Sequence, residues 1–100
     1  GIDAALAAHK LDAIAAPTAC AAWRIDWING DNRSGGSSTP AAAAGYPSIT
    51  VPAGYLHGLP IGLSFFAGAF QEPALIRLAY AFEQATLVRR PPKFQAHAAP

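Results

Sequence analysis

The spacing of apolar and polar residues changes several times along the chain, and each spacing predicts a different element. Over residues 2–10 the apolar side chains of Ile2, Leu6 and Ala5 fall on one face of a helix. Residues 11–16, Leu-Asp-Ala-Ile-Ala-Ala, form a short apolar run closed by Pro17. Because the residue before a proline avoids helical dihedral angles, this run predicts a buried strand.

The regular pattern stops between residues 18 and 38, where Trp23 and Trp27 lie among glycine, asparagine and aspartate residues. An aperiodic loop of this length is longer than most connections, and long loops often carry functional residues. Large amphipathic rings on such a loop either line a pocket or pack the loop onto the core. The sequence leaves both interpretations open.

The middle of the chain predicts a short helix followed by a hairpin. Ser38 or Thr39 is expected as the N-cap of the helix, Pro40 as its first residue and Gly45 as its stop. Residues 48–54 alternate and are β-branched, which predicts a strand, and residues 54–60 hold glycines and a proline that favour a turn. Residues 61–67 predict a second strand, antiparallel to the first.

Residues 72–90 give the strongest helical pattern, with Pro73 at the start. Apolar residues recur on one helical face at Leu75, Leu78, Ala79 and Phe82. Arg89 and Arg90 are expected in the last turn, where positive charge is favourable for the helix dipole. Phe65, Phe66 and Phe82 are expected in the core. Together the elements predict an α/β fold in which a mixed sheet is flanked by helices.

Composition suggests a piece of a larger protein. The chain has 100 residues and no methionine, and only 13% of its residues are charged, about half of the roughly 25% that is usual in soluble domains. The formal net charge of +1, without a basic stripe, argues against a nucleic-acid or anionic-membrane partner. Cys20 is the single cysteine, which fits a reducing compartment, and we expect a cytoplasmic protein.

The run Gly35-Gly36-Ser37-Ser38 is the first candidate for chemistry. A glycine-rich turn can expose a serine nucleophile, but the same residues also suit a turn followed by a helix cap, and the capping pattern is the stronger signal. The three histidines, His9, His57 and His97, lack metal-ligand spacing. We therefore expect no metal site and no cofactor.

The stretch from Ser37 to Thr86 resembles the C-terminal part of amidase-signature proteins. That family has an alanine-rich helix, a strand of the form G-x-P-x-I-T-V-P-x-G, a G-L-P-x-G-L turn and strand, and a closing helix ending F-E-Q-A-T. The corresponding residues here run from Gly45 to Gly54, from Gly58 to Leu63 and from Ala81 to Thr86. The upstream segment Leu-Asp-Ala-Ile-Ala-Ala-Pro-Thr is also similar to a family strand.

The resemblance implies that residues 1–100 are the C-terminal part of a single amidase domain, truncated at the N-terminus. It implies hydrolysis of a carboxamide C–N bond through a Ser-Ser-Lys triad that lies upstream, so we expect no catalytic residue in this chain. Ser37 and Ser38 lack the family's surrounding glycine-serine signature and do not inherit the nucleophile's role. The segment is expected to supply scaffold and pocket wall, with Trp23, Trp27 and Asn29 approaching the substrate.

Three functional hypotheses follow from these patterns. The first is the amidase segment, inactive alone, acting on a small-molecule amide in the complete enzyme, with assembly as a homodimer left open. The alternative is a non-catalytic binding or interaction module derived from the same fold. A third is a minimal serine hydrolase that uses Ser37 or Ser38, which no recognisable general base supports.

Overall fold

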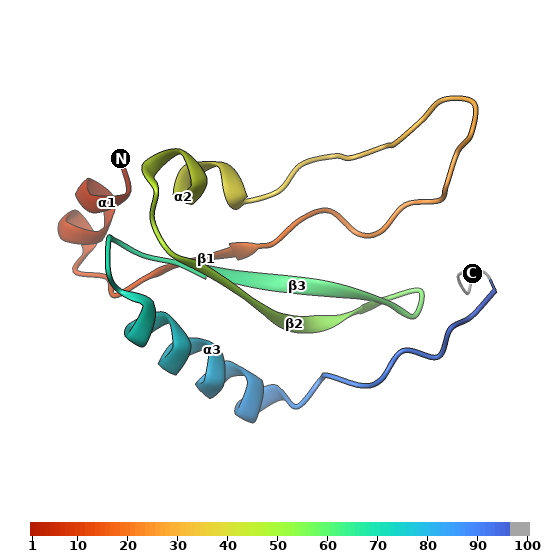
Figure 1. Ribbon diagram of the computed structural model, residues 1–100. Coiled ribbons are helices and arrows are strands. Elements are labelled where there is room, and N and C mark those ends of the chain that lie inside the picture. Colours follow the sequence, from red (N-terminus) through yellow and green to blue (C-terminus); the bar gives the residue numbers. More distant parts are fainter. Residues whose placement is uncertain (97–100) are drawn as a thin grey trace.

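The computed structural model describes residues 1–96, and within them the chain forms three helices and one three-stranded sheet (Figure 1). In chain order the elements are α1 (Ile2–His9), β1 (Ile14–Pro17), α2 (Ser38–Ala44), β2 (Ser48–Leu56), β3 (Leu59–Phe66) and α3 (Glu72–Thr86). The α/β class expected from the sequence is confirmed. Figure 1 shows α3 along one side of the sheet and α2 on the other.

The sheet has the order β1-β3-β2, so the last strand in the chain is the central one. Both of its neighbours are antiparallel to it, and Phe65 is paired with Ala15 on one side and Ile49 on the other. The predicted hairpin is confirmed, with a turn at His57 and Gly58. Both turn residues have positive φ, 51° and 80°, as expected of a two-residue turn that matches the twist of the strands.

Helix α3 covers the face of the sheet to which Phe65 belongs. Leu75 and Ala79 are buried, and the ring of Phe82 meets the ring of Phe65 edge-on with centroids 6.1 Å apart. Burial of one leucine side chain contributes about 1.5–3 kcal/mol. The predicted apolar face of α3 therefore holds the helix on the sheet, while Phe66 is buried on the opposite face.

The predicted end of α3 is wrong. The helix stops at Thr86, and Leu87 takes a left-handed conformation with φ 48°, so Arg89 and Arg90 follow the helix in an extended segment. The Arg90 guanidinium instead lies 3.8 Å from the centre of the Tyr55 ring, and its backbone N–H donates to the Tyr55 hydroxyl at 3.0 Å. These contacts with the hairpin are available only to a chain that has left the helix.

The predicted start of α2, at Pro40, is also wrong, because the helix begins two residues earlier, at Ser38. Ser37 occupies the N-cap position and Pro40 is the third helical residue, although Gly45 ends the helix in a left-handed conformation as expected. Ser37 makes no capping hydrogen bond through its side chain. Its dihedral angles, φ −103° and ψ 7°, are not the extended ones from which a cap hydroxyl reaches the helix N–H groups.

A side-chain hydrogen bond joins α1 to the segment between α2 and β2. The Tyr46 hydroxyl donates to Asp3 at 2.5 Å, and this bond to a carboxylate raises the pKa of Tyr46. No residue of α1 is buried by the rest of the described chain. The contact with Tyr46 is therefore one of the few specific links that place this helix.

The described chain is extended. Its radius of gyration is 15.7 Å, whereas a compact domain of 100 residues has about 13 Å. The long connection between β1 and α2 and the segment after α3 both extend beyond the packed helices and strands in Figure 1. Several large apolar side chains on these two segments are exposed, among them Ile25, Trp27, Ile28 and Phe94.

Replacement of Leu75 with alanine is expected to lower the free energy of unfolding by about 2–5 kcal/mol, because it leaves a cavity between α3 and the sheet. Ile76→Ala is the matched control, since Ile76 is the next residue of the same helix and is 59% exposed. That variant should change stability by no more than about 0.5 kcal/mol. Urea unfolding of both variants checks the pair, and equal losses would contradict the packing of α3 through Leu75.

Candidate functional site

The connection between β1 and α2, called loop 18–37 below, forms two limbs that leave the sheet together at their root and meet at a distant turn (Figure 1). The Ser37 N–H donates to the carbonyl of Thr18 at 3.1 Å, and the Cys20 N–H donates to the carbonyl of Gly35 at 3.3 Å. A β-bridge joins Ala19 to Gly36 between these two bonds. The long irregular loop expected from the sequence is therefore tied together at its root.

Asp26 closes the far end of loop 18–37. Its carboxylate accepts the backbone N–H groups of Ile28 and Asn29, each at 2.9 Å, and the side-chain amide of Asn29 at 2.9 Å. Gly30, with φ 79°, then donates its N–H to the Asp26 carbonyl at 3.1 Å. Hydrogen bonds from Asn29, and then from Ile28, lower the pKa of Asp26.

The three predicted substrate-binding residues occupy different positions on this loop. Trp23 is 38% exposed, and its indole N–H donates to Asp31 on the opposite limb at 3.3 Å. Asn29 lies with Trp23 along a small hollow of about 480 Å³, where its amide is bonded to Asp26. Trp27 is 92% exposed at the end of the loop, so it does not pack the loop onto the core.

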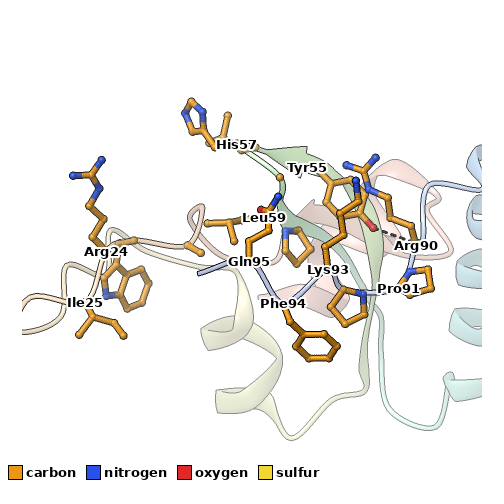
Figure 2. Close-up of a pocket in the computed structure, with 16 residues that line it drawn as sticks. Arg24, Ile25, Tyr55, His57, Leu59, Arg90, Pro91, Lys93, Phe94 and Gln95 are labelled. Atoms are coloured by element: carbon orange, nitrogen blue, oxygen red, sulfur yellow. Dashed lines mark hydrogen bonds between the residues drawn. The ribbon is translucent and has the colours of Figure 1, made fainter. Parts of the chain in front are cut away.

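A larger groove of about 1180 Å³ lies between loop 18–37, the tip of the β2–β3 hairpin and the segment after α3 (Figure 2). Trp23 and Arg24 line it from the loop, Tyr55 from the hairpin, and Arg90 and Lys93 from the segment after α3. Three of its side chains, those of Arg24, Arg90 and Lys93, are basic and none is a carboxylate, so the groove favours anionic or aromatic groups.

Sequence reasoning missed this groove. Tyr55 lies 35 residues before Arg90 in the chain, and the groove forms only because the segment after α3 passes beside the hairpin. Two adjacent prolines after Arg90 were the available signal, since they favour an extended segment over a continued helix. The sequence prediction took these prolines as the end of the helix, which stops four residues before Arg90.

The serine run from Gly35 to Ser38 forms the returning limb of the loop and the start of α2. Ser37 Oγ is buried and has no hydrogen-bond partner among the described residues, so no base is placed to activate it.

His9 and His57 are both exposed, and His97 lies outside the described residues, as does the end of the chain. Within residues 1–96 no three His, Cys, Asp or Glu side chains gather in a group that could hold a metal ion.

Of the helices in residues 1–96, none combines the length and the apolar character required to cross a bilayer.

The chain is similar to parts of known amidases and amidotransferases, although no family model matches it. A probable amidase of Arabidopsis thaliana is 58% identical over 60 residues, which are 59% of this chain and 12% of that protein. A glutamyl-tRNA(Gln) amidotransferase chain of Methanosarcina barkeri is 48% identical over 59 residues, which are 57% of this chain and 12% of that one.

Solved structures extend the similarity to almost the whole chain. Native peptide amidase from Stenotrophomonas maltophilia superposes with a TM-score of 0.84 at 55% identity, over 96% of this chain and 19% of the amidase. Peptide amidase in complex with the competitive inhibitor chymostatin gives a TM-score of 0.89 at 58% identity, over 94% of this chain and 19% of the other. The chain therefore spans about a fifth or less of the relatives it matches.

The Asp26 carboxyl is expected to titrate below 3.8, the ordinary value for aspartate, because three N–H donors favour its charged form. A depressed folded pKa means that the end of the loop gains stability above the ordinary value and loses it as the pH falls through the folded pKa. An NMR titration of the Asp26 carboxyl carbon checks this midpoint. Asn29→Ala should raise it part of the way back, and an unshifted midpoint in the unaltered chain would contradict the turn.

Proposed function

We propose that this chain, which is homologous to a segment of amidase-signature proteins, is part of an enzyme that hydrolyses carboxamide C–N bonds. The observation that carries the proposal is its likeness to peptide amidase structures, at 55–58% identity over 94–96% of the chain. The superposition covers nearly the whole chain rather than one motif. The amidase of Arabidopsis thaliana supports the same reaction class.

In this proposal residues 1–100 are the C-terminal part of one amidase domain, and the Ser-Ser-Lys triad lies in another part of the enzyme. Two features of the chain support that division. Ser37 Oγ has no partner among the described residues that would activate it. The exposed apolar side chains at the end of loop 18–37, Ile25, Trp27 and Ile28, suit a surface that contacts further protein or a ligand.

Within the complete enzyme, loop 18–37 is proposed to form a wall of the substrate cleft. Trp23 is the best placed of the predicted residues, since it lies along both hollows and is held by Asp31. Trp27 would contact substrate through its exposed ring. Asn29 would act through the shape of the loop, because its side-chain amide is already bonded to Asp26. Location in the cytoplasm and assembly as a homodimer stay predictions.

The complete enzyme is expected to release ammonia from carboxamides. A panel of peptides with C-terminal amides, free glutamine and simple aliphatic and aromatic amides separates the substrate classes suggested by the relatives, with ammonia measured by a coupled assay. The matched esters of the same acids report whether the enzyme selects the amide bond. If the complete enzyme cleaves no amide in the panel, the proposed amidase function is wrong.

Alanine at Trp23, Trp27 or Asn29 in the complete enzyme is expected to change the relative kcat/KM for two amides of different acyl size. Trp23→Ala should have the largest effect, since it removes both the ring and the bond to Asp31. A single methylene gained or lost in a hydrophobic pocket changes discrimination about 10-fold to 200-fold, and a tryptophan ring is larger than that. Phe70→Ala is the control, since Phe70 is an aromatic side chain 88% exposed outside the loop. Unchanged discrimination in all three variants would remove loop 18–37 from the substrate cleft.

The alternative is a non-catalytic interaction module, and the exposed apolar surface is the observation that favours it. The coding sequence upstream of Gly1 in the source genome distinguishes the two. A continuous reading frame that encodes a lysine and a glycine-serine-rich signature supports the amidase. A frame that stops within a few codons supports the module.

A further inference from the structure

Three hydroxyl groups meet at the point where loop 18–37 leaves the sheet. Thr18 Oγ1 lies 2.8 Å from Ser64 Oγ, and Ser64 Oγ lies 2.9 Å from Thr50 Oγ1. Thr18 Oγ1 also donates to Thr50 Oγ1 at 3.5 Å. Each hydroxyl comes from a different segment: Thr18 follows β1, Thr50 is in β2 and Ser64 is in β3. We call these three side chains the hydroxyl junction.

Ser64 is the buried centre of the hydroxyl junction, with 3% of its surface exposed. It is paired with Thr50 across the sheet and is adjacent in sequence to Phe65, whose side chain faces α3. Because side chains alternate along a strand, the hydroxyl junction lies on the face opposite α3. A buried hydroxyl is costly unless it is hydrogen-bonded, and its two threonine neighbours meet that requirement.

The backbone of Thr18 adds two further bonds at the same place. Its N–H donates to the Gly62 carbonyl at 2.9 Å, and its carbonyl accepts the Ser37 N–H at 3.1 Å. Thr18 therefore links the departing limb of the loop, the returning limb and both strands of the hairpin. Of the described residues, it is the one that connects the loop root to the sheet through both backbone and side chain.

Two glycines provide the space that this arrangement needs. A Cβ atom on Gly62 would lie 2.8 Å from Thr18 Oγ1 and 2.8 Å from the Thr50 methyl carbon, which is closer than side chains tolerate. A Cβ atom on Gly36 would lie 3.0 Å from the Thr18 carbonyl oxygen, which is tighter than nearly all such contacts. Glycine at these positions therefore lets the loop root approach the sheet closely.

We propose that the hydroxyl junction positions loop 18–37, and that Thr18 is thereby a positioning residue for substrate binding. The second part rests on the proposed amidase function. The loop is long and is anchored at its root, so a small rotation at Thr18 produces a larger displacement at Trp23. Displacements of about 1 Å in a binding wall can change rates by about 100-fold, which makes the root a sensitive point.

The test uses Thr18→Val in the complete enzyme. Valine has the same shape as threonine without the hydroxyl, and Ser64 and Thr50 keep the 2.9 Å bond to each other, so no buried hydroxyl loses its last partner. Thr18→Ser is the matched control, because serine keeps the hydroxyl and lacks only the methyl group. Thr86→Val is a remote control, because it removes a hydroxyl that donates to the Phe82 carbonyl at 2.9 Å on α3.

Hydrogen–deuterium exchange with peptide-level mass spectrometry measures the first part of the proposal. In Thr18→Val the segments that contain the Cys20 and Ser37 amides should exchange about threefold to tenfold faster, the ratio expected for loss of one hydrogen bond. Thr18→Ser and Thr86→Val should leave these segments at the rate of the unaltered enzyme. Equal exchange in Thr18→Val and the unaltered enzyme would overturn the positioning role.

Steady-state kinetics on the best amide measures the second part. Thr18→Val should raise KM about threefold to tenfold while kcat stays within about twofold, because the loop is proposed to bind substrate and not to react with it. Faster exchange with unchanged KM would overturn the link to substrate binding and leave amidase activity standing. An inactive unaltered enzyme would refute the proposed function alone, and the exchange rates would still decide whether the hydroxyl junction holds the loop.

Discussion

The pairing of β3 with strands on both of its edges determines where the rest of the molecule lies. Because side chains alternate along β3, this pairing sends Phe65 toward α3 and Ser64 toward the opposite face. A slip of one residue in the strand pairing would turn the apolar side chains away from α3 and place the hydroxyl side chains against it. The apolar packing of α3 and the polar contacts of the loop root therefore depend on the same register.

The two hollows of the candidate site follow from that register. β1 ends at Pro17, and the next residue already belongs to the loop root, so loop 18–37 departs from a fixed point on the sheet. The hairpin tip lies at the far end of β3, and Arg90 packs on Tyr55 there. The groove thus has three walls. The sheet positions one of them directly, which is the hairpin tip. The other two are loop 18–37, which leaves the sheet after β1, and the segment that follows α3.

The helices and strands could be predicted from the sequence because their signals lie within short stretches of the chain. The four-residue spacing from Leu75 to Ala79 and the paired β-branched strands need no distant partner to be recognised. Arg90 shows where such signals fail. A charge in the last turn of a helix contributes only about 0.3–1 kcal/mol, and ring stacking with a hydrogen bond to Tyr55 is a competing arrangement that no window around residue 90 reveals.

The candidate site was predictable only in outline for the same reason. Length and irregularity identified loop 18–37, and its two tryptophans were the obvious large side chains. Their different exposure depends on Asp31, which reaches Trp23 across the loop and leaves Trp27 free of contact with the core. The hydroxyl junction joins residues 46 positions apart, and a threonine and a serine at that separation carry no pattern that links them.

The end of loop 18–37 is held by hydrogen bonds and is also apolar and exposed. Asp26 holds it through three hydrogen bonds, which is a rigid arrangement, yet it presents Trp27 and Ile28 almost fully to the outside. An ordered apolar surface loses less conformational entropy when it is covered than a flexible one does. A rigid apolar tip with a tightly anchored root is the form expected of a loop that is covered by substrate or by adjoining protein, and the proposed place of this chain in an amidase supplies both.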